Sequence, residues 1–220
     1  MRTRILAIVL TCLVSTGSAL AAVITATGSG WINSTGTPNA TGFDDDYFCN
    51  KLAGWTNNLE YHDWFSFVLP TVEITDATLF VWNDWQNPSP AAVDPDATFH
   101  LYAASDFTFA GLTTGASLGS VRVADANTGV NHFVGIDLNA AGLSALAAAQ
   151  GGRVSFGGSI TTTYPDPATT ELFAFGWSVG TPAAYLRYNV IPEPETYAAL
   201  FAGLGLVGAM ILRWRQHRAR

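Results

Sequence analysis

The sequence predicts an all-β fold: an antiparallel β-sandwich or jelly roll with one short helix, preceded by a signal peptide and followed by a single transmembrane helix. Three observations carry this prediction. Short runs rich in β-branched and aromatic residues recur through the middle of the chain, separated by Gly, Pro, Asn and Asp. An apolar run after two arginines opens the chain, and an uncharged run before several arginines closes it.

Residues 1–21 have the three parts of a secretory signal peptide. Arg2 and Arg4 are charged, residues 5–14 are mostly apolar, and small residues lead to Ala19 and Ala21. A charged start, an apolar centre and an A-x-A site define such peptides. We therefore expect export and cleavage after Ala21. A buried N-terminal strand or an uncleaved anchor is the alternative.

Residues 22–190 are predicted to form one β-sandwich domain. Thr98, His100 and Tyr102 alternate with Phe99 and Leu101, a period of two that suits a strand with one buried face. The one predicted helix is 139–150, with Asn139 able to cap its start and Gly151 with Gly152 able to end it. The predicted strands are 64–69, 77–82, 98–103, 118–123, 132–138, 153–160, 171–177 and 184–191.

Charge excludes one class of partner for this domain. Residues 22–195 hold 17 acidic side chains but only Lys51, Arg122, Arg153 and Arg187 as basic ones, a net charge of −13. A nucleic-acid binder needs basic groups to neutralise phosphates. The acidic balance leaves divalent cations or cationic material as partners.

Cysteine usage excludes an internal disulfide. Cys12 lies in the predicted signal peptide, which leaves Cys49 alone in the exported domain. The domain must then be held by its apolar core. We expect Cys49 to be buried, since a free cysteine behaves as a small apolar residue; pairing between molecules is the alternative.

The predicted membrane helix is 197–212, which contains no charged residue. Its 16 residues fall short of the roughly 20 that usually cross a bilayer, but a flanking arginine and tryptophan extend the effective length. Apolar residues surround the helix, which disfavours the alternative of an amphipathic helix on a soluble fold. The basic residues that follow should stay cytoplasmic; they are Arg213, Arg215, Arg218 and Arg220.

The segment 191–196, just before this helix, contains Pro192, Glu193 and Pro194. Proline fixes φ and lacks a backbone donor, so we expect an extended segment that joins neither helix nor sheet. A processing enzyme can bind such a segment, and a plain spacer is the alternative.

Together, Pro-Glu-Pro, a short Gly- and Leu-rich span and terminal arginines resemble the PEP-CTERM sorting domain of exported proteins in Gram-negative bacteria. The resemblance covers residues 191–220. It implies that Pro192, Glu193 and Pro194 form a recognition motif for exosortase, a membrane-embedded cysteine protease. It also implies an exopolysaccharide-producing cell, transient anchoring in the inner membrane, and delivery to the cell surface or extracellular matrix. Here the arginines are interrupted by Trp214, Gln216 and His217.

The domain itself shares weaker features with β-sandwiches found upstream of that tag. These features are an F-x-F strand and an Asn-Ala-Ala-Gly-Leu helix followed by two glycines. Some such domains look like carbohydrate-binding jelly rolls. No site residue is carried over from this resemblance.

No zinc-protease or nucleotide-binding motif is present in the sequence. There is no H-E-x-x-H or P-loop, and single histidines on strands usually face solvent or form hydrogen bonds. No cofactor is therefore expected. Two acidic clusters could supply oxygen ligands to Ca²⁺ from a loop, although a solvated acidic turn is the simpler explanation. They are Asp44, Asp45 and Asp46, and secondarily Asp94 with Asp96.

Aromatic residues offer a second kind of site. Rings combine large apolar area with a polar handle, so a flat group of them could stack on sugars, or they could fill the core. The residues concerned are Tyr47, Trp55, Tyr61, Trp64, Trp82 and Trp85.

The sequence as a whole favours a non-enzymatic exported surface or matrix protein. The first alternative is a carbohydrate-binding module for the cell's own exopolysaccharide, which requires a contiguous exposed aromatic patch. The second is an extracellular hydrolase, which requires paired carboxylates facing one cleft.

Overall fold

A computed structural model describes residues 20–38, 47–51, 59–83, 96–126, 132–161, 171–176, 183–190 and 194–218. The chain divides into two compact units. Ala21–Asn189 forms the β-rich body, and Met1–Leu20 with Val190–Arg220 forms the other unit.

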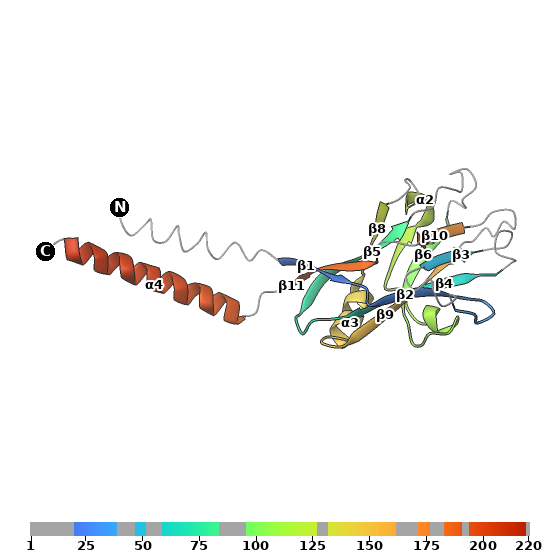
Figure 1. Cartoon of the computed structure of the whole chain (residues 1–220), viewed down its shortest axis with the longest axis horizontal. Helices are drawn as coiled ribbons and strands as arrows, with labels where there is room; N and C mark the ends of the chain where they lie inside the picture. The colour runs from blue at the N-terminus through green and yellow to red at the C-terminus, as the bar shows by residue number, and fades with distance from the viewer. Residues whose placement is uncertain are drawn as a thin grey trace. The chain divides into compact units, whose positions relative to one another are not determined.

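The body is a β-sandwich of two mainly antiparallel sheets, which confirms the predicted fold class at this level (Figure 1). Sheet A has four strands in the order β1 (Leu20–Thr25), β11 (Tyr185–Val190), β5 (Ile74–Asn83) and β8 (His132–Asp137). Sheet B runs β10 (Glu171–Gly176), β3 (Tyr47–Lys51), β4 (Tyr61–Val68), β9 (Arg153–Thr161), β6 (Thr98–Ala103) and β7 (Gly119–Arg122), with β2 (Gly28–Asn33) also paired to β4.

The core lies between the sheets and follows the period of two. Phe65 and Phe67 on β4 face it, and the register places Phe65 opposite Phe156 of β9. Phe99 and Leu101 on β6 are fully buried, as their alternation predicts. Sheet A contributes Leu79 and Val81 of β5 and Ile136 of β8. Burial of these side chains, at about 1.5–3 kcal/mol each, is the main force that holds the sheets together.

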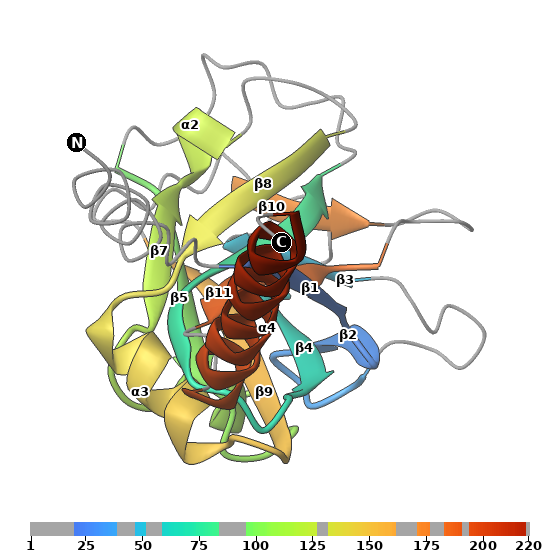
Figure 2. The same ribbon diagram turned by 90° about the vertical axis from the view of Figure 1, so that its left-hand side faces the viewer.

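The predicted helix 139–150 is confirmed as α3 (Ala140–Ala148). The Asn139 side chain accepts a hydrogen bond of 3.0 Å from the Gly142 amide, so it caps the helix as expected. Gly151 follows in the left-handed region, with φ of 72°, which glycine adopts without a steric penalty. Leu146 of this helix is buried and faces the segment between β4 and β5. Figure 2 shows α3 at one end of the sandwich.

Three strands were not predicted. β1 includes the last two residues of the predicted signal peptide, so cleavage after Ala21 would leave 22–25 of that strand. β2 contains two glycines in the sequence GSGWIN, which weakens its apolar alternation. β3 is the third. Short helices α2 (Val123–Ala126) and η2 (Gly111–Thr113) were also missed.

The expected extended segment 191–196 is wrong for its second half. Pro194 is the first residue of α4 (Pro194–Arg218), and Glu195 and Thr196 are helical. Proline fits the first turn because an amide there has no acceptor within the helix and the fixed φ suits helical backbone. Pro192 and Glu193 lie outside the described residues.

The predicted membrane helix falls on α4. Its described apolar side chains are exposed, with Leu206 at 65% and Met210 at 63%. A search of the described residues finds no helix with both the length and the apolar character needed to cross a membrane. Arg213 is exposed, and Arg215 and Arg218 also lie on α4; Arg220 and Ala19 lie outside the described residues.

Candidate functional site

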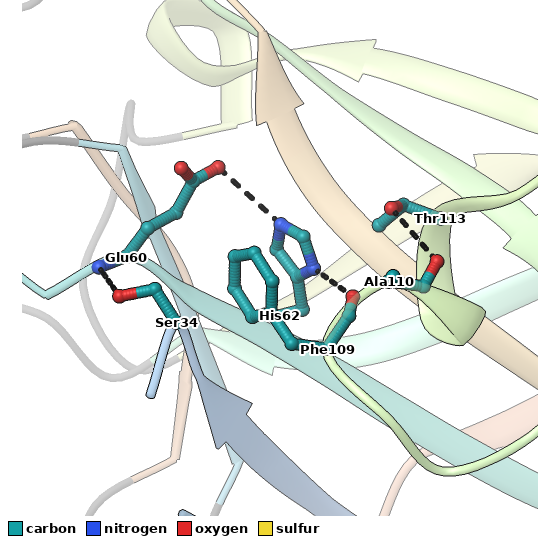
Figure 3. Close-up of polar contacts among 6 residues, drawn as sticks. All are labelled: Ser34, Glu60, His62, Phe109, Ala110 and Thr113. Carbon is teal, nitrogen blue, oxygen red and sulfur yellow. Dashed lines mark hydrogen bonds and ion pairs between the residues drawn. The ribbon is translucent and has the colours of Figure 1, made fainter. Parts of the chain in front are cut away.

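The outer face of sheet B is partly covered by the loop between β6 and β7. Phe109 of this loop stacks on His62 of β4, with ring centroids 3.8 Å apart and planes at 9° (Figure 3). His62 Nδ1 lies 2.8 Å from the Phe109 carbonyl oxygen, and Nε2 lies 3.3 Å from Glu60 Oε1. Phe107 packs edge-on against Trp64, at 4.9 Å between ring centroids. This face is therefore partly occupied by the chain itself.

The outer face of sheet A carries a group of rings, here called the ring cluster: Phe80, Trp82, Phe133 and Tyr185. The Phe80 and Tyr185 rings are stacked at 4.8 Å with planes at 10°. Phe133 meets both Tyr185 and Trp82 edge-on, at 4.9 Å and 5.1 Å. All four side chains are half-buried. They sit together because the outward positions of β11, β5 and β8 adjoin in the sheet.

A hollow of about 420 Å³ lies on the same face, here called the polar pocket. This is within the roughly 300–1,000 Å³ range typical of small-ligand sites. Strand β5 supplies Asp76 and Thr78, and β8 supplies Asp137, directly opposite Thr78 in the register. Its full lining is Ala21, Asp76, Thr78, Asp137, Arg187, Tyr188 and Asn189.

Hydrogen bonds hold both carboxylates of the polar pocket in place. The Thr78 hydroxyl donates to Asp137 Oδ1 at 2.7 Å, and Asn189 Nδ2 donates to Asp76 Oδ2 at 2.9 Å. Each bond uses one oxygen of its carboxylate. Both aspartates are exposed on the sheet, so their remaining oxygens can accept from a ligand.

Arg187 joins the polar pocket to the ring cluster. Its guanidinium carbon lies 4.7 Å from the centroid of the Phe80 ring, a cation–π contact that also orients the guanidinium donors. Gly135 is paired with Phe80 and presents no side chain beside it. Rings, a fixed cation and two fixed carboxylates thus form one continuous surface.

This arrangement suits a polyhydroxylated ligand. Ring faces and edges pack on the C–H surfaces of a sugar, while carboxylates, an amide and a guanidinium pair with its hydroxyls. The sheet is rigid, so these groups need little ordering when a ligand binds.

Most of the residues singled out from the sequence lie outside the described ranges or on sheet B. Asp44–Asp46, Trp55, Trp85 and Asp94 lie outside the described residues, as do the side chains of Tyr47 and Cys49. Trp64 and Tyr61 are three apart on β4 and point to opposite faces of sheet B, while Trp82 lies on sheet A. Of the predicted aromatic platform, Trp82 alone among the described residues joins the ring cluster.

Two described histidines of sheet B have partners within the fold. His62 is hydrogen-bonded, and His100 Nδ1 lies 3.3 Å from Ser117 Oγ. Partial burial lowers the pKa of the His100 imidazole. Within the described ranges, no three His, Cys, Asp or Glu side chains gather where they could hold a metal ion.

Asp63 is an ionisable group that the sequence did not single out. It lies on the core face of β4 and is fully buried. Among the described residues, neither carboxylate oxygen has a hydrogen-bond partner of standard geometry. Burial raises the pKa of the Asp63 carboxyl well above its usual range, and a backbone hydrogen bond lowers it by less. Because it is sealed from solvent, it cannot contact a ligand.

Comparison with known proteins gives structural likenesses only. No family model and no curated protein matches the chain. The adhesin domain of Lys-gingipain from Porphyromonas gingivalis is 10% identical, with a TM-score of 0.31 over 78% of this chain and 96% of that one. Xylanase10C from Cellvibrio japonicus, in complex with xylopentaose, is 13% identical, with a TM-score of 0.27 over 64% of this chain and 25% of that one. TM-scores this low assign the chain to neither family.

Proposed function

We propose that this chain is an exported, non-enzymatic surface or matrix protein whose sandwich binds carbohydrate on the outer face of sheet A. The supporting observation is the continuity of the ring cluster with the polar pocket through the Arg187–Phe80 contact. This is the carbohydrate-binding alternative of the sequence analysis, and of the aromatic residues expected there the proposed site contains Trp82. The ligand class is the exopolysaccharide of the producing cell.

The polar pocket does contain paired carboxylates, which the hydrolase alternative requires. A glycosidase, however, needs one carboxylic acid kept protonated by apolar surroundings. Asp76 and Asp137 are both exposed and each accepts a hydrogen bond from a neighbouring side chain. The environment of the pair therefore favours binding over hydrolysis.

Truncating a ring should test the binding role. We expect Tyr185→Ala to weaken binding to extracted exopolysaccharide about tenfold or more, because the ring contacts both Phe80 and Phe133. Affinity electrophoresis of the folded variant would measure this. Phe107→Ala, which removes an exposed ring over sheet B, is the matched control. If Tyr185→Ala and Phe107→Ala lost the same affinity for exopolysaccharide, or if neither lost any, the binding site would not be the ring cluster.

We propose in addition that residues 1–21 direct export and that residues 191–220 act as a sorting tail. The support is the order of sequence signals, together with the exposed apolar side chains of α4. An exposed apolar helix requires an apolar environment or a protein partner to cover it. The inner membrane would supply the apolar environment, and an exosortase-type protease within it would be the protein partner. The processed protein would then be released to the cell surface.

Pro192→Ala combined with Pro194→Ala tests this sorting role. The apolar run of α4 is unchanged, so we expect the precursor still to reach the membrane. Loss of the Pro192 and Pro194 rings from the proposed recognition motif should abolish processing, leaving full-length protein in the membrane fraction. Cell fractionation and intact mass, compared with wild type, are the measurements. Release of the variant with the wild-type shortened mass would reduce the segment to a spacer.

A further inference from the structure

We propose that the glycan bound at the polar pocket carries ammonium groups, as an amino sugar does. The inference rests on the proposed carbohydrate-binding function and names the chemistry of its ligand. It depends on which atoms of the pocket remain free to bind, on the net charge of its lining, and on the charge of the body around it.

The free atoms of the polar pocket are mostly acceptors. Asp137 has one oxygen engaged by the Thr78 hydroxyl, and Asp76 has one engaged by the Asn189 amide nitrogen. Within the described residues, the other oxygen of each carboxylate receives no hydrogen bond. Asn189 donates through Nδ2, so its side-chain oxygen remains an acceptor, and the Thr78 oxygen can still accept while it donates. A ligand that matches this set must be rich in donors.

An ammonium group is the strongest such donor on a sugar. It offers three N–H donors and a positive charge, and a hydrogen bond to a carboxylate is about twice as strong as one between neutral groups. A hydroxyl offers one donor and no charge. Two anchored carboxylates in one hollow therefore favour an amino sugar over a neutral one.

Arg187 does not reverse this preference. It is the one cationic side chain in the lining, against Asp76 and Asp137, so the pocket has a net charge of −1. Its guanidinium is held against the Phe80 ring at the side of the ring cluster. The body, Ala21–Asn189, holds 15 acidic and 4 basic side chains, a net charge of −11, which attracts cationic polymers and repels uronate-bearing ones. The guanidinium is left to bind hydroxyl oxygens of the same chain.

The test uses the full chain in detergent and three oligosaccharides of equal length: glucosamine, N-acetylglucosamine and galacturonate. Isothermal titration at moderate salt should give at least about tenfold tighter binding of the glucosamine oligomer than of either other one. Asp76→Asn and Asp137→Asn should each weaken glucosamine binding about fivefold or more and weaken N-acetylglucosamine binding by a smaller factor. Asp125→Asn, an exposed acid on α2, is the matched control and should change nothing.

The other outcomes separate this inference from the proposed function. Equal binding of the glucosamine and N-acetylglucosamine oligomers, or tighter binding of galacturonate, would overturn the ammonium inference and leave carbohydrate binding intact. Equal affinity of wild type, Asp76→Asn and Asp137→Asn for the glucosamine oligomer would also overturn the ammonium inference. It would show that the binding comes from the overall negative charge of the protein. Failure to bind all three oligomers and the extracted exopolysaccharide would overturn both proposals.

Discussion

Asp63→Val should raise the free energy of unfolding of the body by about 1–3 kcal/mol at mildly alkaline pH. The wild-type side chain is buried on the core face of β4, and neither of its oxygens has a hydrogen-bond partner of standard geometry in the part of the chain that the structure describes. A buried polar group without partners costs free energy that an apolar replacement does not. Valine is β-branched and suits a strand, and it is close to aspartate in volume.

The same residue should make stability depend on pH in a defined direction. The folded pKa of Asp63 is raised above the unfolded value of about 3.9. Its contribution to stability is therefore fully present below that unfolded pKa and is lost as pH rises toward and through the raised folded pKa. Asp63→Asn cannot ionise and should remove this part of the pH dependence.

Urea unfolding of wild type and both variants from about pH 4 to about pH 9 would measure the two effects. Asp125→Asn controls for loss of an exposed acid, since its side chain is 64% exposed. If the free energy of unfolding changed with pH by the same amount in the wild type and in Asp63→Asn, the assignment of a buried, uncharged Asp63 would be contradicted.

Gly157→Ala should destabilise the body by about 1–3 kcal/mol and release the loop between β6 and β7. Gly157 lies on the outer face of β9, opposite Trp64. A Cβ there would overlap the backbone of Leu112, coming within 2.7 Å of its Cα. Because the clash is with backbone, a rotamer change cannot relieve it, and η2 must lift away. Leu112, now fully buried, would lose its place in the core.

Limited proteolysis and thermal unfolding would report this release. Cleavage should appear within the 104–118 segment in Gly157→Ala and be slow in wild type, since local opening controls such cleavage. Gly28→Ala is the matched control, because its Cβ would meet only the Trp64 ring, at 3.3 Å. Equal resistance of the two variants would show that the loop does not depend on close approach at Gly157.

The sequence pattern predicted a strand correctly where apolar and polar side chains alternate and the flanking residues are polar or small. The strand 98–103 was predicted to the residue, because apolar side chains alternate cleanly and both flanks are polar or small. β2 was missed because Gly28 and Gly30 remove side chains from alternate positions. The buried Asp63 breaks the apolar alternation of β4, and the predicted strand therefore began one residue too late to include it.

The candidate site was beyond sequence reasoning for a physical reason. Its hydrogen bonds join positions far apart in the chain. Asp76 and Asn189 are 113 residues apart, and Thr78 and Asp137 are 59 residues apart. Period-two reasoning shows which side of a strand a residue takes, but not which strands become neighbours. β11 lies between β1 and β5, which brings the last strand of the body beside the first. Spacing in the sequence carries no signal of that adjacency.

The position of the site on β11 has a mechanical consequence. Arg187 and Asn189 lie on the strand that precedes the proposed sorting tail, and Asn189 is five residues before Pro194. While that tail is anchored, part of the tension on a bound polymer would enter β11 directly and reach the anchor. The part held by Asp76 on β5 and Asp137 on β8 would reach β11 through the hydrogen bonds of sheet A. The strand ladders of sheet B lie outside this path and would carry little of the load.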